Sequence, residues 1–374
     1  MPGVRFPASA VRTLRVEMWG RKCYDSRMNR ITRRRYLGLS SGALLGALGG
    51  SRAAGGGDPA VRRFMEQFAV PGISFAIARD GRVVRQGAYG LANLEKQEDL
   101  SISHQFRIAS VSKPITAAAI FLLLERGKLE LDSLVFGDAG ILGIDGPERI
   151  RIRHLLNHTS GGWRNDITDP MFKKPGLDHA ELIRWTLETR PPENEPGAAY
   201  AYSNFGYCLL GRVIEKLGGC PYEDFVKEHV LAPSGAGGMA VGEGEREVAY
   251  YMGGRSVLSK MDVARMDAHG GWVGTPSEMV AFGLRTDGFP DPIDLLEKDS
   301  LATMTARRGV NESYACGWSV NKVGNYWHAG SLPGLSSLLV RTAEGYCWAA
   351  CANTRTAGIN RALDQLMWDL SRSV

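Results

Sequence analysis

The sequence predicts an α+β fold, in which both ends of the chain build one antiparallel sheet around an inserted, mostly helical part. Three observations predict it. Apolar runs of strand length flank an Asp-Gly pair within residues 73–89, similar runs recur within residues 326–353, and helical patterns dominate between them. Because strands gather at the two ends, the simplest arrangement joins them in one sheet flanked by helices. A chain of 374 residues that is 44% hydrophobic can bury such a core.

Residues 1–53 differ from the rest and are predicted to be an export leader. Residues 32–37 read Thr-Arg-Arg-Arg-Tyr-Leu, a weakly apolar segment follows at 38–50, and Ser-Arg-Ala at 51–53 is a small-x-small cleavage site. This order resembles a twin-arginine signal. The apolar segment is too short to predict a membrane span. We therefore expect an exported protein, periplasmic or secreted, without stable membrane insertion; a disordered basic tail is the alternative.

The formal net charge of +5 comes from this leader, which holds 11 of the 45 Lys and Arg residues but 2 of the 40 Asp and Glu residues. The remaining 34 basic and 38 acidic side chains give the body a formal charge of −4. The body has no basic run interleaved with aromatic residues, so nothing indicates a nucleic-acid partner. Its cysteines lie mostly in apolar runs, which favours buried free thiols, with one disulfide as the alternative.

A helix and a β-hairpin are the first elements predicted after the leader. Residues 59–68 have a helical pattern. The apolar runs at 73–79 and 82–89 are separated by Asp80-Gly81, a pair that is typical of a tight hairpin turn.

The segment from Phe106 to Gly127 is predicted to contain a helix buried on all sides. After Ser110 it shows no polar face, which favours burial in the centre of the protein. Pro114 fits the first helical turn, and Gly127 fits the C-terminal stop. Ser110 and Lys113 are one turn apart, so their side chains project from the same side.

This spacing suggests a nucleophile and its base. Burial and the positive end of the helix both disfavour a cation, so the pKa of Lys113 should be low. A neutral amine can take the proton of a neighbouring hydroxyl and activate it. The alternative is a Ser110 N-cap followed by an exposed lysine. A second Ser-x-x-Lys, Ser319 to Lys322, lies in an extended pattern, where an odd separation places the side chains on opposite faces.

The remaining elements follow in order along the chain. Helical patterns occur at 180–188, 205–217 and 222–231, and Thr275–Glu278 is a capping box with Pro at the first helical position, opening a helix through Phe282. Strands are predicted at 314–320, 326–329, 336–341 and 346–353, and a last helix at 359–370. We expect one domain over 54–374, in which 54–135 and 262–374 form the α/β part and 136–261 the helical part.

Two further motifs lie near element boundaries. Tyr202-Ser-Asn204 introduces an apolar helix, although this tripeptide alone is better explained by a surface turn with an Asn cap. His328-Ala-Gly330-Ser331 lies on a strand that ends in a turn, and a glycine there permits the close approach of a ligand.

Lys322-Val-Gly324 competes with His328-Ala-Gly330 as a third motif. Extended apolar patterns flank Lys322–Asn325 on both sides, which favours a hairpin turn at those residues.

Taken together, the three motifs resemble the serine β-lactamase and penicillin-binding protein superfamily, in particular its class C-like branch with esterases and D-amino-acid peptidases. The resemblance covers residues 60–374 and implies a β-lactamase/transpeptidase-like fold. The motifs that carry it are Ser110-x-x-Lys113, Tyr202-x-Asn204 and His328-x-Gly330, reinforced by His158-Thr-Ser-Gly161, Pro196-Gly197 and Tyr314-Ala-Cys-Gly317-Trp318.

The resemblance implies acyl transfer. Ser110 would attack a carbonyl and form an acyl-enzyme, while Lys113 and the Tyr202 phenol shuttle the proton. That role asks for a depressed Tyr202 pKa, which the neighbouring Lys113 cation can supply. Asn204 would hydrogen-bond the acyl side of the substrate, and the backbone N–H groups of Ser110 and Ser331 would form the oxyanion hole.

The third motif departs from the family, because His328 and Gly330 stand where lactamases and transpeptidases carry Lys-Thr-Gly. An imidazole with a pKa near 6.5 is mostly neutral at pH 7, which argues against lactamase activity. Activity on carboxylate-bearing substrates should then rise as the pH falls through this pKa. No G-x-S-x-G, H-E-x-x-H or P-loop occurs after residue 53, and neither a metal nor a cofactor is expected.

The sequence therefore predicts an exported serine hydrolase that acts on an ester or on a D-amino-acid amide or peptide. The first alternative is a class C-like β-lactamase or D,D-carboxypeptidase. The second is a non-catalytic protein that binds peptidoglycan peptides on the same fold.

Overall fold

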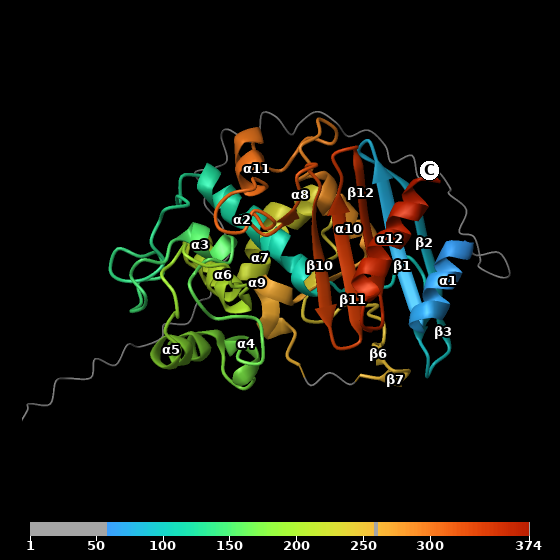
Figure 1. Cartoon of the computed structure of the whole chain (residues 1–374), viewed down its shortest axis with the longest axis horizontal. Coiled ribbons are helices and arrows are strands. Elements are labelled where there is room, and N and C mark those ends of the chain that lie inside the picture. Colours follow the sequence, from blue (N-terminus) through green and yellow to red (C-terminus); the bar gives the residue numbers. More distant parts are fainter. Residues whose placement is uncertain (1–57, 258–260, 374) are drawn as a thin grey trace, which may run out of the picture. The chain divides into compact units, whose positions relative to one another are not determined.

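The computed structural model describes residues 58–257 and 261–373, so the predicted leader lies outside the described residues. A seven-stranded sheet has the strand order β3-β2-β1-β12-β11-β10-β9. At its centre β1 (Gly72–Arg79) pairs with β12 (Tyr346–Ala352) in antiparallel register from Ile73 opposite Ala352 to Arg79 opposite Tyr346 (Figure 1). The prediction that both ends of the chain build one antiparallel sheet is confirmed.

The N-terminal hairpin forms as its Asp-Gly pair predicts. Asp80 and Gly81 both have positive φ angles, 49° and 78°, as a two-residue turn that matches the strand twist requires. The second strand, β2 (Arg82–Asn93), continues beyond the predicted end to pair with the short edge strand β3 (Glu98–Asp99).

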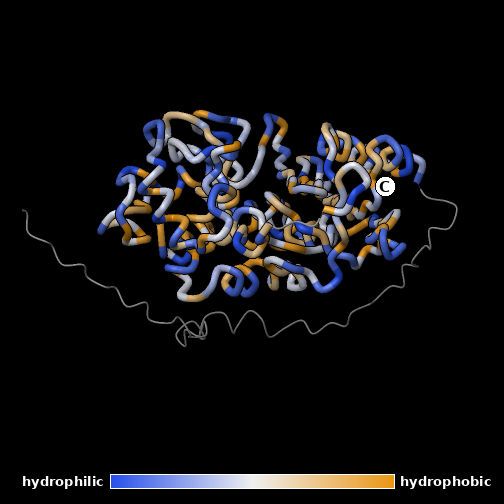
Figure 2. Tube along the Cα trace, turned by 90° about the horizontal axis from the view of Figure 1, so that it is seen from below, coloured by the Kyte–Doolittle hydropathy of each residue, from blue (hydrophilic) through white to orange (hydrophobic). Residues whose placement is uncertain are grey.

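Helices cover both faces of the sheet. The helices α1 (Pro59–Phe68) and α12 (Ile359–Ser371) pack against one face, and α10 (Pro276–Leu284) packs against the other (Figure 1). The predicted capping box at Thr275–Glu278 opens α10. Figure 2 shows hydrophobic segments concentrated in the interior. The core between the sheet and the helices α1 and α12 includes Phe64, Phe75, Trp348 and Leu363.

The central helix α2 (Ser112–Glu125) is buried at every position from Ser112 to Leu123. It packs against α6 (Asn204–Gly218) and α9 (Asp267–Gly270). A single 3₁₀ turn, η3 (Ala109–Val111), precedes α2 and carries Ser110. The N-cap of α2 is therefore Val111 and not Ser110, which leaves the Ser110 hydroxyl available for other contacts.

The region between the two halves of the sheet is mostly helical. Its helices are α3 (Ile152–Leu156), α4 (Pro170–Lys173), α5 (His179–Thr189), α6, α7 (Tyr222–Val226) and α8 (Ala232–Ser234). The helix predicted at 222–231 is divided, because a π-helical segment, η4 (Lys227–Leu231), follows α7.

Several short strands were not predicted. A second sheet joins β4 (Phe106–Arg107), β8 (Trp272–Gly274) and β5 (Ala240–Val241), and β6 (Tyr251–Met252) pairs with β7 (Arg255–Ser256). Strands of two or three residues are too short to show an alternating pattern. Two further short helices are η5 (Ala264–Met266), before α9, and α11 (Lys298–Met304), after α10.

The predicted strand at 314–320 is wrong for most of its length. Only β9 (Ser319–Val320) is a strand. Residues 314–318 form a turn that is closed by an isolated β-bridge between Tyr314 and Ser319, and in it the Ala315 N–H donates to the Trp318 carbonyl, 2.8 Å away. Gly317 in this turn has φ +82°, and a Cβ there would lie 2.8 Å from Ala117 Cβ on α2. A side chain would not fit, so the glycine lets the turn pack directly on the central helix.

The last strands agree with prediction. β10 (Tyr326–Leu332) and β11 (Leu335–Arg341) precede β12 and form a hairpin. Cys208, Cys316, Cys347 and Cys351 are free thiols, and Cys316 is partly exposed. Within residues 58–257 and 261–373, no helix is both long and apolar enough to cross a membrane.

Candidate active site

A cavity of about 520 Å³ opens where η3, β10 and the segments before α4 and α6 meet. Six of the seven predicted site residues line it: Ser110, Tyr202, Asn204, His328, Gly330 and Ser331. The seventh, Lys113, is fully buried, and its Nζ lies 3.1 Å from Ser110 Oγ. The structure therefore brings together side chains that are more than 200 positions apart in the sequence.

The backbone that presents Ser110 is strained. Ala109, the preceding residue, has a positive φ of 48° although it is not glycine, which costs about 1–2 kcal/mol. Neighbouring bonds hold it there: the Ile108 N–H donates to the Trp272 carbonyl at 2.9 Å, and Ser112 Oγ donates to the Ala109 carbonyl at 2.7 Å. Such strain is typical of functional sites, where the surrounding structure imposes it.

Lys113 has three oxygen neighbours and no exposure to solvent. Its Nζ lies 3.1 Å from Ser110 Oγ, and it donates to Asn204 Oδ1 at 2.9 Å and to the His269 carbonyl of α9 at 2.8 Å. Burial lowers the pKa of Lys113 to about 7, and the nearby Asp169 carboxylate opposes that shift. The expected low pKa is thus present, and desolvation is its main cause.

The expectation for Tyr202 was wrong in one respect. Burial raises the pKa of its phenol above the ordinary value, and the hydrogen bond with Ser110 only partly offsets this. Lys113 Nζ lies 4.8 Å from the centre of the Tyr202 ring, so the amine faces the ring. The phenol therefore stays protonated at neutral pH and can donate a hydrogen bond.

Asn204 opens α6 with its side chain held from two sides. Its Oδ1 accepts from Lys113 Nζ, and its Nδ2 donates to Asp169 Oδ2, 2.8 Å away. Asp169 was not identified from the sequence. It is 1% exposed, and burial raises the pKa of its carboxyl to about 6. The signal that could have found it is Asp169-Pro170, an N-cap followed by proline.

His328 is buried in β10, and its charge state differs from the expectation. Its Nδ1 donates to the Ala329 carbonyl at 2.9 Å, so in the neutral ring Nε2 accepts from the Tyr314 hydroxyl at 3.0 Å. Burial lowers the pKa of His328 to about 3, and the Lys113 charge adds to this shift. The imidazole is therefore neutral above about pH 4. The expectation that activity on carboxylate-bearing substrates rises as the pH falls through an imidazole pKa near 6.5 is wrong.

Gly330 is required by packing against the turn that carries Ser110. A Cβ at this position would lie 2.3 Å from the Ile108 carbonyl oxygen and 2.2 Å from Ser337 Oγ. The close approach predicted for a ligand is thus made by the protein itself. Because β9 pairs with β10 only at Tyr326 and Trp327, the strand beyond lies beside η3 and brings Ser331 to the cavity.

The His158 motif has a structural role beside Tyr202. The buried His158 ring accepts from the Ser203 N–H at Nδ1, 3.1 Å away, and the His158 carbonyl accepts from the Ala201 N–H at 2.8 Å. Its ring centre lies 4.2 Å from that of Tyr202. Burial holds the pKa of His158 well below its ordinary value, so this ring packs as a neutral group and fixes the segment that carries Tyr202.

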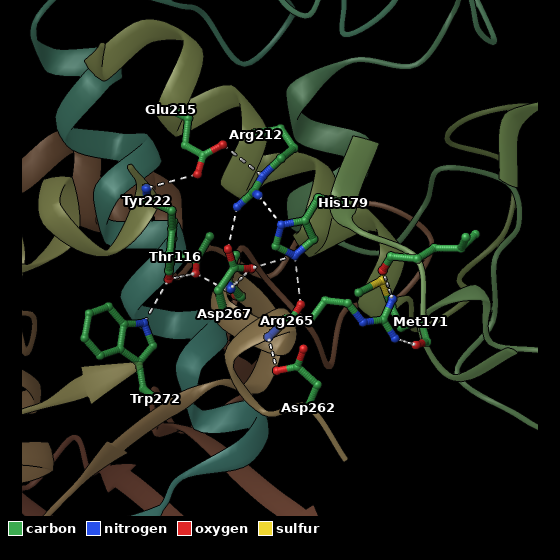
Figure 3. Close-up of polar contacts among 12 residues, drawn as sticks. Thr116, Met171, His179, Arg212, Glu215, Tyr222, Asp262, Arg265, Asp267 and Trp272 are labelled. Carbon is green, nitrogen blue, oxygen red and sulfur yellow. Dashed lines mark hydrogen bonds and ion pairs between the residues drawn. The ribbon is translucent and has the colours of Figure 1, made fainter. Parts of the chain in front are cut away.

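A charged cluster behind the cavity anchors α9. Arg212 of α6 contacts both Asp267 and His179, and His179 Nε2 donates to the Arg265 carbonyl at 2.8 Å (Figure 3). Asp267 Oδ1 also accepts from the Ala268 N–H at 2.5 Å. These contacts fix the short helix α9. The carbonyl of His269 in this helix accepts the hydrogen bond from Lys113 Nζ.

The second Ser-x-x-Lys is placed differently. Ser319 of β9 lines the same cavity, but Lys322 is exposed in the turn that precedes β10. The predicted hairpin turn at Lys322–Asn325 is present, and it removes the lysine from its serine. Among the described residues, no group of three or more His, Cys, Asp or Glu side chains could hold a metal ion.

Known relatives of the chain include a penicillin-binding protein. Penicillin-binding protein 4* of Bacillus subtilis (strain 168) is 34% identical over 163 residues, which is 42% of this chain and 35% of that protein. Protein flp of Staphylococcus aureus (strain MW2) is 24% identical over 323 residues, which is 83% of this chain and 65% of that protein. The chain thus spans less than two thirds of the length of either relative.

Solved structures show the same fold. A D-amino acid amidase from Ochrobactrum anthropi SV3, complexed with L-phenylalanine amide, superimposes with a TM-score of 0.69 at 24% identity, covering 84% of this chain and 98% of that one. An octameric penicillin-binding protein homologue from Pyrococcus abyssi gives 0.65 at 24% identity, covering 79% and 72%. The family model named Beta-lactamase matches residues 58–371. With this match over most of its length, the chain belongs to the Beta-lactamase family.

Proposed function

We propose that this protein is an exported serine hydrolase that forms an acyl-enzyme at Ser110 on an ester or on a D-amino-acid amide or peptide. The observation that carries the proposal is the contact of 3.1 Å between Ser110 Oγ and Nζ of the buried Lys113, at the wall of a cavity. A lysine with a pKa of about 7 is largely available as a base near neutral pH. The names of the relatives, penicillin-binding proteins and a D-amino acid amidase, agree with acyl transfer.

The proposed reaction has two halves. Ser110 Oγ bonds to the substrate carbonyl carbon while its proton passes to Lys113 Nζ. The bond to the leaving oxygen or nitrogen then breaks, and that atom takes the proton of the Tyr202 hydroxyl, which is hydrogen-bonded to Ser110. The proton held by Lys113 replaces it, so the amine is neutral again for the second half. Water next attacks the acyl carbon, returns a proton to Ser110 through the same groups, and releases the acid. The backbone N–H groups of Ser110 and Ser331 would stabilise the oxyanion.

The charge of the cavity supports a neutral substrate. His328 stays uncharged because its pKa is about 3, whereas a lysine there would attract a carboxylate. At roughly 4 Å and an effective dielectric constant of about 20, the lost attraction is at most about 4 kcal/mol, on the order of a thousandfold. We therefore favour neutral esters and amides over carboxylate-bearing substrates such as β-lactams, with Asn204 and His328 contacting the substrate.

Intact-mass spectrometry tests the proposal directly. We expect one adduct after treatment with a fluorophosphonate probe, absent in Ser110→Ala, and little adduct after treatment with a penicillin. A stable penicillin adduct would favour the penicillin-binding alternative. No adduct with any probe would favour the non-catalytic peptide-binding protein.

Steady-state kinetics then address the substrate. At pH 8, neutral esters of short acids should give a higher kcat/KM than nitrocefin. A wild-type enzyme that hydrolyses nitrocefin much faster than any neutral ester would reject the ester and amide assignment in favour of a β-lactamase.

Export is proposed from residues 32–53, which lie outside the described residues. Replacing Arg33, Arg34 and Arg35 by Lys keeps the charge but removes the guanidinium geometry. The precursor should then accumulate in the cytoplasm, as fractionation and immunoblotting would show. Unchanged export of this variant would indicate another route.

A further inference from the structure

The buried carboxylate of Asp169 is the starting point of a further inference. It ends the loop before α4, and its Oδ1 accepts from the Met171 N–H at 2.9 Å, which caps that helix. Its Oδ2 accepts from Asn204 Nδ2 at 2.8 Å. The carboxylate thus joins a helix cap to the candidate active site, although it does not line the cavity.

An ionised carboxylate can only accept hydrogen bonds, and this fixes the amide of Asn204. The donor Nδ2 must point to Asp169, so the acceptor Oδ1 must point to Lys113. Without such a partner, the two ends of the amide could exchange places. Asp169 therefore decides which end of Asn204 meets the lysine.

The orientation of Asn204 in turn fixes the amine. Neutral Lys113 has two N–H groups and one lone pair, and two of its three neighbours, Asn204 Oδ1 and the His269 carbonyl, can only accept. Both N–H groups are used there. The lone pair is then left for the third neighbour, Ser110 Oγ, at 3.1 Å.

We propose that Asp169 is a positioning residue that, through the amide of Asn204, directs the lone pair of Lys113 at Ser110. The inference rests on the proposed function, because it explains how the lysine would act as the base for that serine. It concerns a residue that does not contact the nucleophile.

Asp169 also supplies the negative charge that acts on the amine. The other titratable groups around Lys113 are uncharged near neutral pH: burial lowers the pKa values of His158, His269 and His328 and raises that of Tyr202. Asp169 itself is faced by Lys113 and by Asp166 of its own loop. Removing its charge should therefore lower the pKa of Lys113 further.

Two variants separate this role from helix capping, since Asn and Ser are both good N-cap residues. In Asp169→Asn, the side-chain oxygen of the new Asn must accept from the Met171 N–H. Its NH₂ group then faces Asn204, and the Asn204 amide must rotate so that its oxygen accepts from that NH₂ group. The Asn204 NH₂ then donates to the lone pair of Lys113. In Asp169→Ser, the hydroxyl can cap α4 but no group faces Asn204, so nothing forces the reversal.

The measurement is the second-order rate of labelling by a fluorophosphonate probe from pH 4.5 to 9. We expect Asp169→Asn to lower the plateau rate roughly a hundredfold, as for loss of a general base, and Asp169→Ser to lower it less. In both variants the acidic limb of the pH–rate profile, where the rate rises with pH, should move to lower pH by roughly one unit. Asp178→Asn, which alters the N-cap of α5 in the same way, is the matched control and should change neither.

The outcomes can be told apart. If Asp169 only caps α4, Asp169→Asn should lower the plateau rate less than Asp169→Ser, and the acidic limb of the pH–rate profile should not move. That result would overturn the inference. Wild-type protein that is not labelled at Ser110 would instead overturn the proposed function. If neither variant folds, the wild-type profile decides: protonation of both Asp169 and Lys113 should give a slope approaching two on the acidic limb, and a slope of one would overturn the inference.

Discussion

The chain contains the same four-residue pattern twice, and the two copies differ in secondary structure and in the burial of the lysine. Ser110 and Lys113 lie on a 3₁₀ turn and the first turn of α2, so their side chains meet at 3.1 Å. Ser319 ends up on β9 and Lys322 in the exposed turn after it. Both serines line the same cavity. Proximity to the cavity is common to both serines, so local backbone geometry and burial of the lysine are the features that set the proposed nucleophile, Ser110, apart from Ser319.

Replacing the two serines should give the largest difference in activity between the two copies of the pattern. Ser110→Ala should abolish labelling by a fluorophosphonate and any hydrolysis, whereas Ser319→Ala should retain both. Thermal unfolding should show that both variants fold, because neither serine caps a helix in this structure. A label that moves to Ser319 would reverse the assignment of the two copies.

The lysines give the next largest difference. Lys113→Met removes the proposed general base and should lower the labelling rate by roughly 10²–10⁴-fold. Lys322→Met removes an exposed side chain, so the rate should be unchanged. Equal losses in the two variants, measured at pH 8 with matched protein stability, would show that the two lysines do not differ in function.

The charge of the cavity provides a third test. His328→Lys should raise the ratio of kcat/KM for nitrocefin to that for a neutral ester at pH 8, by at most about a thousandfold. The neutral variant His328→Gln is the control and should not raise it. If the two variants shift the ratio equally, the charge at this position does not select the substrate.

The pH dependence should separate the two copies as well. Lys113 can accept a proton only when neutral, so labelling should rise with pH through its pKa of about 7 and then level off. At pH 5 roughly 1% of the amine is neutral, which by itself predicts a rate about a hundredfold below the plateau, and protonation of Asp169 should lower the rate further. Asp169, with a pKa of about 6, titrates on the same limb. The Lys322→Met variant should keep this profile, and a flat wild-type profile would contradict it.

Two glycines give the smallest effect. Gly317 packs against α2, where a Cβ would lie 3.1 Å from the Lys113 carbonyl, whereas Gly324, in the turn after Lys322, has its nearest such contact at 3.7 Å. Both have positive φ angles, so alanine at either should cost about 1–2 kcal/mol of unfolding free energy. Only Gly317→Ala should also slow labelling. Chemical denaturation and labelling rates would show whether stability and activity separate in this way.

Sequence reasoning identified the elements whose patterns are long. The hairpin at 73–89 and the apolar helix after Ser110 were predictable because period and burial are visible in a single segment. The two- and three-residue strands β4, β5 and β8 carry no period, and the turn at 314–318 depends on packing of Gly317 against a helix 200 positions earlier.

The candidate site was predictable as a set of residues but not as an electrostatic environment. Burial of Tyr202 and His328 decides their pKa values, and burial depends on the whole fold. Asp169 was missed because its partner Asn204 is 35 positions away, and Asp169-Pro170 indicates only a helix N-cap and not this contact. Which groups are charged, and which way an amide points, follow only from the assembled structure.

The burial of Lys113 has a consequence for folding. Its pKa falls from 10.5 in an accessible chain to about 7 in the native state, a difference equivalent to about 5 kcal/mol. Below pH 7 the native protein carries this full desolvation cost, and between pH 7 and 10.5 the unfolded chain binds the extra proton, so the native state gains stability as the pH rises. Above 10.5 the amine is neutral in both states and the cost disappears. The protein is thus least stable, as far as this residue is concerned, in the acidic range where the amine is also protonated and unable to act as a base.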